Sequence, residues 1–189
     1  MQTPVTGLIL AGGRSRRFGS DKAVHPIGGE AMIRKAYTAL CAVTDDIVIS
    51  VRHESQRYDL EATYVADRYR GMGPLAGLDA GFTAAQHDWL CVLACDMPLV
   101  HPSDVRSILD AREDGIGGIV SVDSEGMRQP LCGCYYRPTV ELHAKSLLQS
   151  RHLSMMGLLE RIKVREVVVE GTSLINVNRP ADLEFYSLL

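Results

Sequence analysis

The chain has 189 residues, of which 46% are hydrophobic and 23% are charged, and its formal net charge is −3. This composition is ordinary for a soluble globular protein, and the negative charge argues against a general nucleic-acid-binding surface. No apolar run approaches the roughly 20 residues that a membrane-spanning helix needs, and the N-terminus lacks the pattern of a signal peptide. We therefore expect one domain over residues 1–189 that acts in the cytoplasm, with no nucleic-acid and no membrane partner.

Apolar runs alternate with segments of helical periodicity through the first half of the chain. Residues 89–96 are apolar along their length, which is typical of a strand covered on both faces, and Pro74 opens a helix rich in small residues. The predicted strands are 6–11, 46–51, 62–67 and 89–96, and the predicted helices are 30–43 and 73–86.

The second half breaks this regular alternation, which suggests that it covers or completes a site. The predicted helices are 101–114, 139–150, 154–162 and 180–189, and the predicted strands are 117–122, 129–136 and 164–170. Alternation of strands and helices predicts an α/β fold, in which a mostly parallel sheet has helices on both faces.

Polar residues follow the first four predicted strands, where ligands of open α/β sheets bind. Gly12 and Gly13 follow the first strand, Ser50 and Arg52 lie at the end of the second, Asp67 follows the third and Asp96 the fourth. We expect a nucleotide-sized ligand to contact all four positions.

The segment from Gly12 to Lys22 is strongly basic, with four cationic side chains against one carboxylate: Arg14, Arg16, Arg17 and Lys22 against Asp21. Its glycines allow backbone N–H groups to approach an anion closely, and cations beside such a nest favour phosphate. The segment fits neither the P-loop pattern nor the dinucleotide-binding fingerprint, so it predicts a phosphate site of another class.

This segment resembles that of the molybdenum cofactor guanylyltransferases, a family of nucleotidyltransferases with a Rossmann-like fold whose pattern is roughly L-A-G-G-x-S-x-R-[MF]-G-x-D-K. The matching residues are Leu10–Gly13, Ser15, Arg17–Gly19 and Asp21–Lys22. The resemblance continues in order through the segments 73–78, 94–100, 128–136 and 175–183. It implies a Rossmann-like three-layer sandwich of the nucleotidyltransferase type.

The resemblance implies a reaction in which the terminal phosphate of molybdopterin attacks the α-phosphorus of GTP and releases pyrophosphate. Lys22 and Arg17 would contact the triphosphate, and Asp96 would be the protein ligand of Mg²⁺, which prefers one or two carboxylates plus phosphate oxygens. For Arg14 and Arg16, phosphate contact and a solvated surface position both stay open.

The other implied contacts divide between the nucleotide and the acceptor. Leu10, Ala11, Gly12 and Gly13 would contact the nucleotide through their backbone, Ser50 stands where relatives often have an asparagine near the base, and Asp67 would contact the base, the ribose or the metal. Gln129, Asn176 and Asn178 would face the acceptor, although an asparagine before Pro180 is also a common helix cap. The N-terminal half would thus bind GTP and Mg²⁺, and the C-terminal half would complete the acceptor site. Molybdoenzymes or their chaperones are further implied partners.

Two alternatives stay open. The first is another nucleotidyltransferase, which would use CTP for the same cofactor or would activate a sugar phosphate or a phospholactate. The second is a non-catalytic nucleotide- or cofactor-binding carrier for molybdoenzyme assembly, against which the presence of Asp96 and Lys22 argues.

The chain has five cysteines, Cys41, Cys91, Cys95, Cys132 and Cys134. An odd number argues against a disulfide framework, and the spacings are not those of zinc sites. We expect the cysteines to be small, buried hydrophobic side chains.

Overall fold

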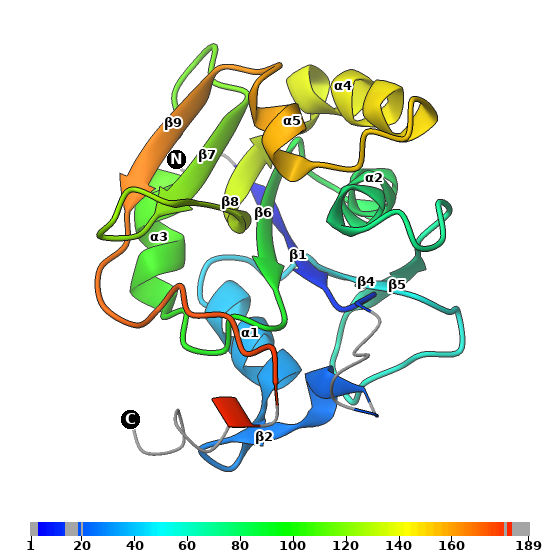
Figure 1. The fold of residues 1–189 in the computed structure, drawn as a ribbon, viewed down its shortest axis with the longest axis vertical. Helices are drawn as coiled ribbons and strands as arrows, with labels where there is room; N and C mark the ends of the chain where they lie inside the picture. Colours follow the sequence, from blue (N-terminus) through cyan, green and yellow to red (C-terminus); the bar gives the residue numbers. More distant parts are fainter. Residues whose placement is uncertain (1–3, 14–18, 20, 180, 183–189) are drawn as a thin grey trace.

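A sheet of seven strands forms the centre of the part of the chain that the computed structural model describes, which is residues 4–13, 19, 21–179 and 181–182 (Figure 1). In spatial order the strands are β5 (Thr63–Ala66), β4 (Ile47–Val51), β1 (Val5–Leu10), β6 (Trp89–Ala94), β8 (Arg128–Tyr136), β7 (Gly118–Val122) and β9 (Val164–Val168). Only the pairs of β8 with β6 and with β7 are antiparallel among these strands. The predicted mostly parallel sheet is confirmed.

Helices cover both faces of the sheet. One apolar cluster packs α1 (Met32–Cys41) and α3 (Pro102–Asp110) against one face, and a second packs α2 (Pro74–Ala84), α4 (Arg137–Gln149) and α5 (Met155–Leu159) against the other (Figure 1). The result is the expected Rossmann-like three-layer sandwich.

Alternation along the central strands supplies both clusters. Successive side chains of a strand point to opposite faces, so Leu8 and Ile9 of β1 belong to different clusters, as do Val92 and Leu93 of β6. All four are at most 1% exposed. This two-sided burial explains why the strands are apolar throughout.

Strand register places the polar residues after β1, β4, β5 and β6 at one edge of the sheet. Leu10 is paired with Ser50 of β4 and with Ala94 of β6, and Val51 is paired with Ala66 of β5. Because β8 runs antiparallel to β6, its first residues reach this same edge. A strand from the second half of the chain thus joins the candidate site.

Several element limits differ from the sequence-based expectation. The predicted helix 30–43 begins only at Met32, because Glu30–Ala31 forms strand β3 in a small hairpin with β2 (Pro26–Ile27). The turn between them holds Gly28 and Gly29 at φ 58° and 83°, which glycine tolerates and which suits a tight hairpin. Lys22–Val24 forms a 3₁₀ turn, η1.

Two further predictions concern the ends of the fold. The closing helix expected at 180–189 lies outside the described residues apart from 181–182. Across the described residues, none of the helices combines the length and the hydropathy that crossing a membrane would need.

Candidate functional site

A cavity of about 540 Å³ opens at the carboxyl edge of the central strands. It is lined by residues from the ends of β1, β4 and β6, from the start of α2 and from the segment before it. The lining residues are Leu10, Gly12, Gly13, Lys22, Ser50, Arg52, His53, Asp67, Arg70, Gly71, Gly73, Pro74, Gly77, Ala94, Cys95, Asp96 and Leu131.

Lys22 and Asp96 form an ion pair at one side of this cavity. The Lys22 ammonium lies 2.6 Å from Asp96 Oδ2, and both side chains are largely buried, at 14% and 21% exposure. The other carboxylate oxygen, Oδ1, is buried without a hydrogen-bond partner among the described residues. A buried carboxylate oxygen without a partner is costly, so this atom is available to a ligand that can satisfy it.

The C-terminal segment is attached directly to this pair. The backbone N–H of Val177 donates to the backbone carbonyl of Asp96 at 2.8 Å, and Lys22 Nζ lies 3.5 Å from the carbonyl of Val177. Asn176 and Asn178 are the chain neighbours of Val177, so the backbone of this segment lies next to the ion pair. The Asp182 carboxylate accepts from the N–H groups of Asn178 and Arg179, and these bonds lower the pKa of Asp182.

Asp67 and Ser50 form a second polar pair at the floor of the cavity. Ser50 is 1% exposed, and its hydroxyl donates to Asp67 Oδ1 at 2.6 Å. Burial raises the pKa of the Asp67 carboxyl, and the Ser50 hydrogen bond and the Arg52 charge offset only part of this effect. The second oxygen, Oδ2, lies 3.0 Å from where a Cβ on Gly12 would be, so glycine is what allows the carboxylate to lie against this backbone.

Arg52 joins the end of β4 to the backbone after β1. Its Nε lies 3.4 Å from the carbonyl oxygen of Gly12, and its Nη2 donates to the carbonyl oxygen of Gly13. Arg52 therefore binds two consecutive backbone carbonyls at the cavity wall.

The structure brings together most of the site residues expected from the sequence. The lining includes Leu10, Gly12, Gly13, Lys22, Ser50, Asp67 and Asp96. Ala11 is buried, its N–H donates to the carbonyl of Ser50, and it is not among the residues that line the cavity. Gln129 lies two residues before Leu131 of the lining. Arg14, Arg16 and Arg17 lie outside the described residues.

Some lining residues carry no signal in the sequence. Arg70 and His53 lie on connections whose paths no local pattern specifies. Leu131 belongs to the segment 128–136 that resembles the family, and it reaches the cavity because β8 is antiparallel to β6. Gly73, Pro74 and Gly77 belong to the glycine motif at 73–78.

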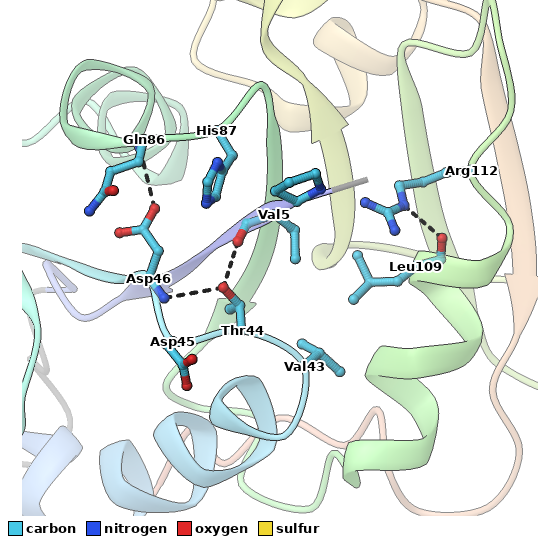
Figure 2. Close-up of a pocket in the computed structure, with 10 residues that line it drawn as sticks. Val5, Val43, Thr44, Asp45, Asp46, Gln86, His87, Leu109 and Arg112 are labelled. Carbon is cyan, nitrogen blue, oxygen red and sulfur yellow. Dashed lines mark hydrogen bonds between the residues drawn. The ribbon is translucent and has the colours of Figure 1, made fainter. Parts of the chain in front are cut away.

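A second cavity, of about 550 Å³, lies at the opposite edge of the sheet (Figure 2). It surrounds the start of β1 at Val5, and Asp46 in its wall accepts hydrogen bonds from Thr6 and from the backbone of Gln86. Because ligands of α/β sheets bind at the carboxyl ends of strands, the first cavity is the candidate active site.

A three-layer α/β sandwich with glycines, a lysine and a carboxylate at the carboxyl edge of its sheet is the arrangement expected of a nucleotidyltransferase. The model of the MobA-like NTP transferase domain matches residues 7–165, and the chain belongs to this family.

Curated relatives support the same assignment. The molybdenum cofactor guanylyltransferase of Desulfosudis oleivorans is 34% identical over 95% of this chain and 93% of its own. A probable molybdenum cofactor guanylyltransferase of Pelotomaculum thermopropionicum is 34% identical over 94% of this chain and 89% of its own.

Solved structures share the fold. Molybdopterin-guanine dinucleotide biosynthesis protein A from Archaeoglobus fulgidus superposes with a TM-score of 0.81 at 22% identity, over 97% of both chains. The 2-C-methyl-D-erythritol 4-phosphate cytidylyltransferase of Thermus thermophilus superposes with a TM-score of 0.74 at 16% identity, over 100% of this chain and 98% of its own.

Proposed function

We propose that this chain transfers GMP from GTP to the terminal phosphate of molybdopterin, which yields the guanine dinucleotide form of the cofactor and pyrophosphate. The observation that carries this proposal is the Lys22–Asp96 pair at the carboxyl-edge cavity. It occurs in a chain of the MobA-like family whose relatives bear the name of this activity.

Lys22 and Arg17 are the proposed cationic contacts of the reacting phosphates. In the reaction, an oxygen of the molybdopterin phosphate bonds to the α-phosphorus of GTP, and the bond from that phosphorus to the pyrophosphate oxygen breaks. Two anions must be aligned and their charge offset, and no covalent enzyme intermediate is required. Lys22 lines the cavity, and Arg17 belongs to the same basic segment of the sequence.

Asp96 is the proposed protein ligand of Mg²⁺. Its buried Oδ1 has no partner among the described residues, which fits a cation that takes one or two carboxylates and completes its shell with phosphate oxygens and water. Within the described part of the chain, no group of three or more His, Cys, Asp or Glu side chains is placed to bind a metal. When bound, Mg²⁺ would offset the negative charge of the phosphates.

The nucleotide is proposed to lie over the end of β1, against the backbone of Leu10, Ala11, Gly12 and Gly13. Asp67 is proposed to accept hydrogen bonds from it through Oδ2, because Oδ1 is already bonded to Ser50. Ser50 therefore acts on the nucleotide through Asp67, since its one donor is used.

We assign the acceptor side to the C-terminal half of one domain. Asn176 and Asn178 flank the residue bonded to Asp96, and Gln129 lies at the start of β8, whose Leu131 lines the cavity. These three side chains are proposed to contact molybdopterin. Molybdoenzymes or their chaperones are the proposed recipients of the product.

A nucleotide panel tests the proposal. The purified protein is titrated with GTP, CTP, ATP and UTP in the presence of Mg²⁺, and pyrophosphate release is followed with and without molybdopterin. We expect clear preference for GTP and pyrophosphate release only when molybdopterin is present. Equal binding of all four nucleotides, or preference for CTP, would contradict guanylyl transfer.

Asp96→Ala separates an enzyme from a carrier. An enzyme that uses Asp96 as proposed loses turnover by about 10²-fold or more while keeping its fold, because the metal loses its protein ligand. A carrier keeps its hand-over of cofactor in the same variant. Circular dichroism of the variant serves as the control for folding.

A further inference from the structure

The connection between β4 and β5, residues 52–62, holds the carboxylate of Asp21. Gln56 Nε2 and the Tyr58 hydroxyl each donate to Asp21 Oδ2 at 2.8 Å, and the backbone N–H of Ala23 donates to Oδ1 at 3.1 Å. Gln56 Nε2 also donates to the Tyr58 hydroxyl oxygen at 2.6 Å. Three donors from two parts of the chain keep this carboxylate in one orientation.

The same glutamine continues the hydrogen-bond chain toward the cavity. Gln56 Oε1 accepts from the backbone N–H of Arg52 at 3.1 Å, and the Arg52 guanidinium binds the carbonyl oxygens of Gly12 and Gly13. One connected network therefore reaches both flanks of the basic segment, Gly12–Gly13 on one side and Asp21 on the other.

Tyr58 is itself held by the sheet. The hydroxyl of Tyr64, in β5, donates to the carbonyl of Tyr58 at 2.6 Å and accepts from its N–H at 3.3 Å, and the two rings stack with centroids 6.5 Å apart. Burial, followed by the Asp21 hydrogen bond, raises the pKa of the Tyr58 phenol. Its hydroxyl therefore stays protonated and remains a donor to Asp21.

Asp21 in turn orients Lys22. Its side chain caps η1, which begins at Lys22, and the Lys22 ammonium lies 2.6 Å from Asp96 Oδ2 at one side of the cavity. Displacement of a reacting group by about 1 Å can cost on the order of 10²-fold in rate, so residues that fix Asp21 influence a catalytic cation that they do not touch.

We propose that Gln56 and Tyr58 are positioning residues for nucleotidyl transfer, which hold Asp21 so that Lys22 faces Asp96, while Arg52 holds Gly12 and Gly13 at the same cavity. The substrate named in this inference rests on the proposed function, whereas its residues are identified by the hydrogen-bond network.

Two variants and one matched control test it. Tyr58→Phe removes only the hydroxyl bonded to Asp21, and Gln56→Glu places a second carboxylate against it. The control is Tyr37→Phe, whose lost hydroxyl donates to the carbonyl of Glu61 in the same 52–62 connection. Turnover per folded enzyme, the KM for GTP, the Kd for Mg²⁺-GTP and the melting temperature are measured for each.

We expect Tyr58→Phe to lower kcat by about 3- to 10-fold and Gln56→Glu by about 10-fold or more near pH 8, with smaller changes in KM. The Gln56→Glu deficit should shrink toward about pH 5.5, because two adjacent carboxylates share a proton and regain a hydrogen bond. In an Asp21→Ala background, Tyr58→Phe should have no further effect, because the group it orients is gone. Tyr37→Phe should behave as the wild type.

Equal kcat and Kd in Tyr58→Phe, Gln56→Glu and Tyr37→Phe would overturn the proposal, and so would a full Tyr58→Phe effect in the Asp21→Ala background. Absence of guanylyl transfer by the wild-type chain would instead contradict the proposed function. The kcat comparison with the nucleotide that the wild-type chain does transfer then still decides the role of Gln56 and Tyr58.

Discussion

At the scale of single residues, the candidate site depends on two carboxylates in different surroundings. Asp96 is paired with Lys22 and keeps one buried oxygen without a partner among the described residues. Asp67 is held by a serine, and burial raises its pKa. These surroundings support the proposal that Asp96 binds a cation and that Asp67 accepts hydrogen bonds from a nucleotide.

Asp67→Asn should change GTP affinity and the pH dependence of thermal stability in separately measurable ways. We expect GTP affinity to fall about 10-fold or more, because a hydrogen bond to a charged acceptor is lost. The native state holds a proton on Asp67 more tightly than the unfolded state does, so the stability contributed by this carboxyl is present at low pH and is lost as pH rises through its raised native pKa. The asparagine variant does not titrate, so its melting temperature relative to wild type should rise with pH.

Thermal unfolding of both proteins from about pH 3 to pH 8 measures how this difference in melting temperature changes with pH. The range begins below the ordinary aspartate pKa of about 3.9. Asp59→Asn, at an exposed position of the 52–62 connection, is the control and should leave both GTP affinity and the relative melting temperature unchanged. A relative melting temperature of Asp67→Asn that falls as pH rises would contradict the prediction.

At the scale of elements, close packing of α2 on the sheet places the glycine motif at the cavity. A Cβ on Gly81 would come 2.4 Å from Leu8 Cδ2, and one on Gly77 would come 2.7 Å from Leu10 Cδ2 and 2.9 Å from Ser50 Oγ. Glycine at these two helical positions therefore lets α2 approach β1 and β4. This approach brings Gly73 and Pro74, at the start of the helix, to the cavity.

Gly81→Ala should destabilise the protein although alanine is the better helix former. The added methyl group meets the fully buried Leu8 side chain, and overpacking of this kind costs about 1–3 kcal/mol. Gly157→Ala in α5 is the matched control, because among the described residues its Cβ would meet only Ser154 Cβ, at 3.7 Å. There we expect no loss or a gain of up to about 1 kcal/mol. Urea unfolding of both variants measures the difference, and equal free energies of unfolding would refute the packing explanation.

At the scale of the whole molecule, the cysteines show how completely the sheet is covered. All five are free, and Cys91, Cys95, Cys132 and Cys134 are buried, while Cys41 is partly exposed. Burial raises the pKa of Cys95, Cys132 and Cys134 to about 12. The expectation of small, buried side chains is confirmed for these four residues and is wrong for Cys41.

A thiol titration of the native protein should therefore modify Cys41 quickly and the other four only upon unfolding, because the thiolate is the reactive form and must be accessible. Cys41→Ser should abolish the fast phase. Several thiols that react at one common rate in the native protein would show that the sheet opens readily, contrary to this prediction.

Much of the fold was predictable from local patterns. The order of strands and helices, the apolar strand at 89–96 and the helix opened by Pro74 all follow from periodicity and from single residues with strong conformational preferences. The hairpin at Pro26–Ala31 was not predicted, because two-residue strands leave no period to detect. Seven of the expected site residues line the cavity. Six of them lie in the last residues of parallel strands or directly after them, and such strands end at the same edge, whereas Lys22 comes from η1.

The sequence by itself determined the layered α/β architecture, the basic glycine segment and the order of the motifs, because these depend on residues close together in the chain. Only the tertiary structure decided that β8 is antiparallel, that Ser50 bonds Asp67, and that Gln56 and Tyr58 reach Asp21 from 35 and 37 residues away. Such contacts depend on the path of a connection and on strand direction, and the packing of the whole domain determines both.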